Sequence, residues 1–258
     1  MSAQRNSDSV PAASSSSWQS ARLLVTDEFA APPVILRVGD SVIGTLGNFS
    51  ASTGKAKSKK TFNVCAIVAA AMTGGTVLNY SASLPPRKRR ILYVDTEQSR
   101  FHCKRVLCRI LRLAGLPTDA HPPLLEFLCL RGYATKERLR KIEEAIYDLD
   151  NLGLVVIDGI RDLAHDINSP GEATDLITKL MQWTDERRIH IHTVLHLNKG
   201  DDNTRGHLGT ELNNKAETVL QITKDDFDRD ISSGNKGFSP ATGSATGQQQ
   251  GVQRAVIF

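Results

Sequence analysis

Short apolar runs alternate with segments of helical periodicity along the middle of the chain. The runs are four to eight residues long, and the segments between them repeat apolar residues three and four positions apart, as amphipathic helices do. Such alternation is typical of a parallel sheet with crossover helices. The pattern predicts strands over 90–95, 124–130, 152–158 and 189–196, helices over 99–116, 135–149 and 173–187, a polar loop over 197–214 and a last apolar run over 216–223.

Both ends of the chain lack this alternation. Residues 1–17 are rich in Ser, Ala and Asn, and residues 226–258 contain a long run of Gly, Ser, Thr, Gln and Asn, so both are predicted to be disordered tails. Residues 18–46 carry short apolar pieces around a Pro-Pro break and predict a small N-terminal elaboration. The core is expected to span residues 47–225, with an α/β fold whose mainly parallel central sheet is flanked by helices.

The segment that enters the first core helix has the features of a phosphate-binding loop. The pattern of such loops is G-x-x-x-x-G-K-[ST], followed by a helix. A register that ends at Gly54-Lys55 puts Ala56 at the hydroxyl position and a run of lysines inside a buried helix. A register that ends at Lys60-Thr61 keeps the first glycine, the lysine and the hydroxyl, and the helix begins together with the apolar run over 62–72. We therefore adopt the second register.

In this register Lys59 replaces the second glycine, which normally lets backbone N–H groups approach the phosphates at the helix N-terminus. The motif is therefore imperfect, and the alternative is a solvated Lys/Ser turn without a ligand. The residues predicted to bind the nucleotide phosphates are Gly54, Lys57, Ser58, Lys59, Lys60, Thr61 and Phe62.

Polar residues follow the other strands where ligands of open α/β sheets bind, beyond the carboxyl ends. Asp158 ends an apolar run, as in a Walker B motif, and is predicted to bind Mg²⁺ together with Thr61. Glu97 follows a second strand and is a candidate to orient the attacking water. His196 and Asn198 are candidate γ-phosphate sensors. Each of these residues also has an alternative structural role. Asp158 could cap a helix, Glu97 could stand at the start of a helix, where the dipole favours a carboxylate, and His196 and Asn198 could be ordinary polar residues at the start of a loop.

Together these segments resemble the RecA-like ATPases, and within them the RepA-type hexameric helicases and related proteins of mobile elements. The resemblance covers roughly residues 40–225, and it rests on the segments GKAKSKKT (54–61), YVDTEQS (93–99), VVIDG (155–159) and HLNK (196–199) with Arg205-Gly206 behind them. Two features depart from the family: Lys59 in place of glycine, and a chain that stops resembling strands after Thr223, where the family continues its sheet.

The resemblance implies ATP and Mg²⁺ as ligands, single- or double-stranded DNA as a partner, and self-association into a ring or filament. It implies a catalytic role for Lys60. The family places its catalytic carboxylate on the strand beside the phosphate loop, which maps to Glu97. It also places a basic residue after the last core strand, where it reaches the neighbouring subunit's nucleotide; this maps to Arg205, with Lys199 as the second choice.

Composition changes this picture little. The net charge of +4 is compatible with a polyanionic partner but does not require one. Four cysteines without metal-ligand spacing indicate reduced thiols of a cytoplasmic protein. No run of about 18 apolar residues occurs, so no membrane span is expected. The basic run 87–90 is a candidate phosphate contact or a solvated loop, and the histidines at 190, 192 and 196 share a strand face without the companion ligands of a metal site.

The sequence therefore predicts a Mg²⁺-dependent, ATP-hydrolysing motor that acts on DNA, helicase-like, in the replication or mobilisation of a mobile element. Two alternatives stay open. One is a nucleotide-dependent regulatory switch without unwinding activity. The other is a degenerate ATP-binding module, since Lys59 weakens the loop motif.

Overall fold

The computed structural model describes residues 17–56, 58–196 and 206–223. The chain forms two units, residues 1–31 and residues 32–258. In the first unit the short 3-10 helix η1 (Ser17–Ala21) is followed by an irregular segment with several exposed apolar side chains. The predicted tails, residues 1–17 and 226–258, lie outside the described residues except for residue 17, and the predicted domain boundaries stay predictions.

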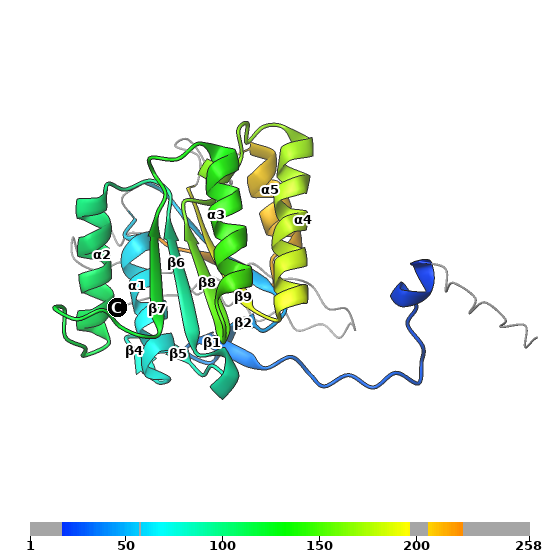
Figure 1. The fold of residues 1–258 in the computed structure, drawn as a ribbon, viewed down its shortest axis with the longest axis horizontal. Helices are drawn as coiled ribbons and strands as arrows, with labels where there is room; N and C mark the ends of the chain where they lie inside the picture. The colour runs from blue at the N-terminus through cyan, green and yellow to red at the C-terminus, as the bar shows by residue number, and fades with distance from the viewer. Residues whose placement is uncertain (1–16, 57, 197–205, 224–258) are drawn as a thin grey trace, which may run out of the picture. The chain divides into compact units, whose positions relative to one another are not determined.

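The second unit is built on a six-stranded sheet in which every neighbouring pair of strands is parallel (Figure 1). Helices cover both of its faces, α1 and α2 on one and α3, α4 and α5 on the other. This arrangement confirms the predicted α/β fold and is consistent with a RecA-like fold. The strand order is β10 (Thr218–Gln221), β3 (Phe49–Gly54), β9 (His190–His196), β8 (Leu152–Asp158), β6 (Arg90–Asp95) and β7 (Leu125–Cys129). The helices are α1 (Lys60–Thr73), α2 (Arg100–Leu113), α3 (Thr135–Asp148), α4 (Pro170–Arg187) and α5 (Gly206–Lys215).

The central strands are buried on both faces. Every residue of β8 is buried, because helices cover the sheet on both sides. Such a strand has to be apolar almost throughout instead of alternating with polar residues. This explains why residues 152–158 stand out in the sequence as one apolar run, and why its first charged side chain, Asp158, marks the end of the strand.

The phosphate-loop helix α1 is apolar around most of its circumference and is buried from Val64 to Met72. A helix of this kind needs cover on all sides. The six-stranded sheet and α2 cover part of it, and a second, antiparallel sheet packs on it through β4 (Thr76–Val77) and β5 (Tyr80–Ala82). The other strands of that sheet are β1 (Val34–Val38) and β2 (Ser41–Thr45), in the order β2-β1-β5-β4.

The predicted strands and helices between residues 90 and 196 agree with the structure within three residues at each end. Strands 90–95 and 152–158 agree at both ends. Helix α4 begins at Pro170 and not at residue 173, because Ser169 caps it and its hydroxyl accepts the Glu172 N–H at 3.3 Å. None of the helices in the described part of the chain could cross a membrane.

The predicted polar loop over 197–214 is wrong in its second half. Residues 206–215 form α5, in which Leu208, Gly209 and Leu212 are buried, and the helix packs on α4. Leu208 and Leu212 lie one helical turn apart, which is too short an apolar pattern to stand out among polar neighbours. Gly206 and Gly209 therefore belong to a helix, not to a mobile loop. Residues 197–205 lie outside the described residues.

Candidate functional site

Residues 54–61 join β3 to α1 at the carboxyl edge of the sheet. Gly54 ends β3, and a Cβ at this position would lie 2.4 Å from the Ile222 carbonyl oxygen and 2.6 Å from Ser58 Oγ. Only glycine fits so close an approach. Lys59 stands where the motif has its second glycine, and it adopts a left-handed conformation with φ 64° and ψ 26°. The loop therefore keeps a backbone geometry that favours glycine although a lysine occupies the position.

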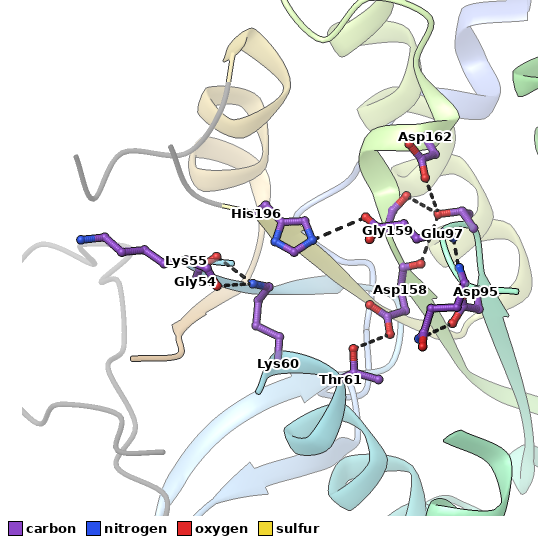
Figure 2. A network of polar contacts seen from close by, with 12 residues as sticks. Gly54, Lys55, Lys60, Thr61, Asp95, Glu97, Asp158, Gly159, Asp162 and His196 are labelled. Carbon is purple, nitrogen blue, oxygen red and sulfur yellow. Dashed lines mark hydrogen bonds and ion pairs between the residues drawn. The ribbon is translucent and has the colours of Figure 1, made fainter. Parts of the chain in front are cut away.

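Lys60 opens α1, and its side chain folds back over the loop (Figure 2). Its Nζ donates hydrogen bonds to the carbonyl oxygens of Gly54 and Lys55, each at 2.8 Å. Burial lowers the pKa of Lys60 to about 8, against the opposing effect of the Asp158 and Glu97 carboxylates. A buried ammonium group held by neutral carbonyls is well placed to gain an anionic partner. The Lys55 side chain points away from this loop (Figure 2).

Thr61 and Asp158 meet at the same edge. The hydroxyl of Thr61 donates to Asp158 Oδ2 at 3.0 Å, and the hydroxyl of Tyr93 donates to the same oxygen at 2.8 Å. Burial raises the pKa of Asp158 to about 6, although both hydrogen bonds act to lower it. A hydroxyl and a carboxylate are oxygen ligands of the kind that Mg²⁺ prefers.

These residues fit a nucleotide with its metal ion. Ser58 Oγ is buried without a hydrogen-bond partner within the described residues, and a buried hydroxyl normally has one. Phosphate oxygens above the loop would give Ser58 and Lys60 acceptors, while Thr61 and Asp158 would supply metal ligands. Phe62 follows in the first turn of α1, where its N–H donates to the Lys59 carbonyl oxygen at 3.0 Å.

Glu97 stands on a turn that Asp95 holds in place. Asp95 Oδ1 accepts the N–H groups of Glu97 and Gln98 at 3.0 and 2.7 Å, and its Oδ2 accepts the side-chain amide of Gln98. Beside the turn, Gly159 has φ 101°, and a Cβ there would lie 2.2 Å from Thr96 Oγ1 and 2.9 Å from Glu97 Cγ. Asp95 and Gly159 therefore set the position of Glu97, and their place at two strand ends was the signal for them in the sequence.

His196 lies next to Glu97, with 3.5 Å between Nε2 and Glu97 Oε1 (Figure 2). This interaction is the main cause that lowers the pKa of Glu97, whose side chain is about two-fifths exposed. Glu97 is therefore charged at neutral pH and open to water. His196 also pairs in register with Gly54 across the β3–β9 ladder, so it stands between the phosphate loop and Glu97.

The expectation that Glu97 follows the strand beside the phosphate-loop strand is wrong. The neighbours of β3 are β10 and β9, and β6 is two strands further away. Glu97 reaches the site because β6 pairs with β8, with Asp95 in register with Asp158. The hydroxyl of Thr96 strengthens this junction by donating to the Gly159 carbonyl oxygen at 2.8 Å.

The structure thus brings Gly54, Ser58, Lys59, Lys60, Thr61, Phe62, Glu97, Asp158 and His196 to one edge of the sheet. Lys57, Asn198, Lys199 and Arg205 lie outside the described residues. Tyr93 and Thr96, which support the site, carry no role in the sequence prediction, because Asp158 and Gly159 become their neighbours only in the folded sheet. Asp95 carries none either, although its partners Glu97 and Gln98 are close in sequence. Within the described residues, no cluster of three or more His, Cys, Asp or Glu side chains is arranged to hold a metal ion by itself.

Comparisons with known proteins support the nucleotide interpretation. A family model described as an AAA domain matches residues 19–202, which is more than half of the chain. A comparison with curated proteins found no match.

Proposed function

The chain belongs to the AAA domain family of nucleotide-hydrolysing P-loop ATPases, and we propose that it hydrolyses ATP with Mg²⁺ as a RecA-like, helicase-like motor acting on DNA. The observation that carries the ATPase proposal is the convergence of Lys60, Thr61, Asp158 and Glu97 at one edge of the sheet. A role in replicating or mobilising a mobile element is part of the proposal and rests on the resemblance of the four motif segments.

Lys60 and the loop backbone bind the phosphates. The ammonium exchanges its carbonyl partners on Gly54 and Lys55 for phosphate oxygens, and the added negative charge raises the pKa of Lys60 from about 8. The lysine then stays protonated through the working pH range. Thr61 and Asp158 hold the metal ion. A Mg²⁺ ion bound by these two side chains would supply positive charge for the phosphoryl group and the leaving oxygen.

Glu97 acts on the attacking water. Its lowered pKa keeps the carboxylate charged, so it accepts a hydrogen bond from water. It takes up the water's proton as the new P–O bond forms and the bond from the γ-phosphorus to the bridging oxygen breaks, with ADP as the leaving group. His196, held 3.5 Å from Glu97 and in register with Gly54, senses the γ-phosphate and positions Glu97. We assign Asn198 to the same sensor and Arg205 to the neighbouring subunit's site, where positive charge stabilises the transition state.

The proposal includes DNA as a partner and assembly into a ring or filament. They are supported by the resemblance and by a positive net charge of +4. A regulatory switch and a degenerate binding module share the same fold, and fold alone does not separate them from a motor.

The test is ATP hydrolysis by the full chain, measured with and without Mg²⁺ and with and without single-stranded DNA. We expect Mg²⁺-dependent turnover that DNA stimulates. Glu97→Gln is expected to keep ATP affinity and to lose at least about 10²-fold in turnover, the scale of a lost general base. Lys60→Ala is expected to lose ATP binding, whereas the control Lys55→Ala keeps most of it.

Each alternative has its own outcome. Slow turnover without a response to DNA supports the switch, and ATP binding without turnover supports the degenerate module. Equal losses in Lys55→Ala and Lys60→Ala contradict the register of the loop. A Glu97→Gln variant that hydrolyses ATP at the parent rate removes Glu97 from the mechanism.

A further inference from the structure

Helix α2 concentrates positive charge. Its 14 residues include five cationic side chains and no carboxylate. The whole chain has a net charge of +4, so the remainder of the chain, without these five charges, has a net charge of −1. The positive excess of the protein therefore lies on a single helix. The five residues are Arg100, Lys104, Arg105, Arg109 and Arg112.

Helix α3 offers a comparison within the same fold. It also has 14 residues, but its four basic side chains are balanced by four acidic ones. Two of the pairs, Arg140–Glu144 and Lys141–Glu137, form ion pairs one turn apart. In α2 the positions one turn apart carry like charges, which destabilise a helix. Among the described residues, no cation of α2 forms an ion pair with a carboxylate.

Four of the five charges, those of Arg100, Lys104, Arg105 and Arg112, lie on exposed side chains of α2, whereas Arg109 is half-buried. The opposite face, with Cys103, Val106, Ile110 and Leu111, is buried toward α1 and the sheet. Four exposed side chains of α2 lie on one stripe of the helix, because residues three, four or seven positions apart share a helix face. These are Phe101, Lys104, Arg105 and Arg112. Phe101, at the N-terminal end of this stripe, is 69% exposed. In Figure 1, α2 lies at the outer edge of the helix layer.

A cavity of about 560 Å³ opens at the N-terminal end of the stripe. Its lining includes Ser99, Arg100, Arg131 and Tyr133, so it adds one more arginine and a second aromatic ring. Arg100 lines the cavity and is the first residue of α2, directly before Phe101, so the cavity opens where the stripe begins.

Part of the basic segment at residues 87–90 has a structural explanation. Of the four cations in residues 87–90, Lys88 donates from Nζ to the Arg187 carbonyl oxygen at the end of α4, where the helix dipole favours a cation. Helix α2 carries its cations along its whole length, so capping does not explain them.

We propose that the stripe of Phe101, Lys104, Arg105 and Arg112 binds single-stranded DNA; the choice of DNA rests on the function proposed above. Interfaces with nucleic acid are strongly positive, and an exposed aromatic ring stacks on an unpaired base. A protein partner would need an apolar centre at the interface. A membrane-bound helix would need its apolar face free to enter the lipid, and α2 buries that face.

The position of α2 gives this surface a route to the nucleotide site. The helix begins at Arg100, three residues after Glu97, and the intervening turn is held by Asp95. A strand bound along α2 therefore acts at the end of the same turn that positions Glu97. This is a direct physical path for stimulation of turnover by DNA.

The test is binding of fluorescent oligo-dT to the full chain, followed by anisotropy across a range of salt concentrations. We compare the parent with Arg105→Glu/Arg112→Glu on α2 and with the control Lys136→Glu/Arg140→Glu on α3. Both variants change exposed residues and alter the net charge equally. We expect the α2 variant to lose at least about tenfold in affinity and about 1.4 in salt slope, for two lost contacts to a single strand. The control stays within about twofold of the parent.

Phe101→Ala tests the single-stranded part of the proposal. It is expected to weaken oligo-dT binding by at least about fivefold, the low end for a lost stacking contact, and to leave duplex binding unchanged. Equal effects on duplex and single strand, or none on either, overturn the assignment to single strands.

The outcomes separate this inference from the proposed function. A parent that binds DNA while both double variants bind equally well overturns the role of α2 and leaves the proposed function intact. A parent that binds neither form of DNA overturns both, and binding of the parent to phosphatidylserine vesicles instead would assign α2 to a membrane surface. Thermal unfolding checks each variant, and Arg105→Gln/Arg112→Gln replaces the double glutamate variant if that one does not fold.

Discussion

Lys59 holds a left-handed backbone conformation at the position where the phosphate-loop motif has glycine. For a residue with a Cβ this conformation costs roughly 1–2 kcal/mol. Its carbonyl oxygen compensates in part, because it accepts the N–H groups of Phe62 and Asn63 and the side-chain amide of Asn63 at the start of α1. The sequence departs from the motif, but the backbone does not.

We therefore expect Lys59→Gly to stabilise the protein relative to Lys59→Ala. Both substitutions remove the lysine side chain, but only glycine relieves the left-handed backbone, so the difference in the free energy of unfolding is expected to be about 1 kcal/mol. Urea unfolding of the two variants measures it. If Lys59→Ala is as stable as Lys59→Gly, position 59 is not strained.

Asp158 lowers the free energy of unfolding at neutral pH. Its pKa of about 6 in the folded state lies above its ordinary value of 3.8, so between these values the folded state binds more protons than the unfolded state. The contribution of protonated Asp158 to the free energy of unfolding is therefore fully present below pH 3.8, and it is lost as the pH rises through about 6. The loss amounts to about 3 kcal/mol. The cause is burial of a carboxylate that the proposed metal site needs in its charged form.

Asp158→Asn is therefore expected to raise the free energy of unfolding of the ligand-free protein at pH 7.5, by up to about 3 kcal/mol. At pH 4 the variant and the parent should differ little, since Asp158 is then protonated. The same variant should lose Mg²⁺-dependent ATP hydrolysis. Urea unfolding at the two pH values decides the matter: a variant less stable than the parent at pH 7.5 would show that Asp158 stabilises the fold.

At the scale of elements, a chain of buried hydrogen bonds links β2, β3 and β9. The Thr45 carbonyl oxygen accepts the N–H of His190 Nδ1 at 2.9 Å, which leaves Nε2 to accept the Ser50 hydroxyl at 2.7 Å. Ser50 Oγ then accepts from His192 Nδ1, and Ser52 donates to His192 Nε2, each at 2.8 Å. One carbonyl therefore sets the tautomer of both imidazoles, and both rings are neutral.

Burial lowers the pKa of His190 to about 4 and that of His192 to about 3, from an ordinary value of 6.5. Below pH 6.5 the unfolded state therefore binds more protons. The contribution of the two neutral histidines to the free energy of unfolding is fully present above pH 6.5. It falls as the pH decreases, by up to about 1.4 kcal/mol per pH unit for each histidine.

His192→Gln is expected to remove one of these two contributions. Between pH 6 and pH 4.5 its free energy of unfolding should fall less steeply than that of the parent, by about 1.4 kcal/mol per pH unit. Urea unfolding across this range measures the slope, whatever the absolute stability of the variant. The exposed residue His165 provides the control substitution His165→Gln, which should keep the parent slope. A parent slope in His192→Gln would mean that His192 is not buried in its neutral form.

At the scale of the whole molecule, the residues of the candidate nucleotide site lie within one chain, whereas the proposed ring or filament adds Arg205 from a neighbour. Arg205 follows the last strand before α5 in the sequence, and its role rests on the resemblance to RecA-like ATPases. We expect Arg205→Ala to keep nucleotide binding and to lose turnover.

Mixing Arg205→Ala subunits with Lys60→Ala subunits should then partly restore turnover. In a mixed interface the intact loop of one subunit meets the intact arginine of the other. Turnover measured against mixing ratio and against total protein concentration tests this. Specific activity that does not change with concentration, from a protein that light scattering finds monomeric with ATP and DNA, would reject the role in trans.

The sequence by itself determined the elements whose signal is local. Strands 90–95 and 152–158 were recognisable because a parallel sheet covered by helices on both faces requires continuous apolar runs. The order of glycine, lysine and hydroxyl in residues 54–61, followed by an apolar run, predicted the turn from β3 into α1. The apolar runs that precede Asp158, Glu97 and His196 likewise predicted that these three residues lie at strand ends.

Only the tertiary structure decided which of these ends are neighbours. Thr61 meets Asp158 across 97 residues of sequence, and Thr96 meets Gly159 across 63. These contacts depend on the insertion of β9 and β8 between β3 and β6, which no local pattern records, because strand order follows from how all the apolar faces are buried together. Helix α5 and the antiparallel sheet that covers α1 were also not evident from the sequence. Two or three buried residues are enough to hold such an element in place once the surrounding elements have folded, and so few leave no clear sequence pattern.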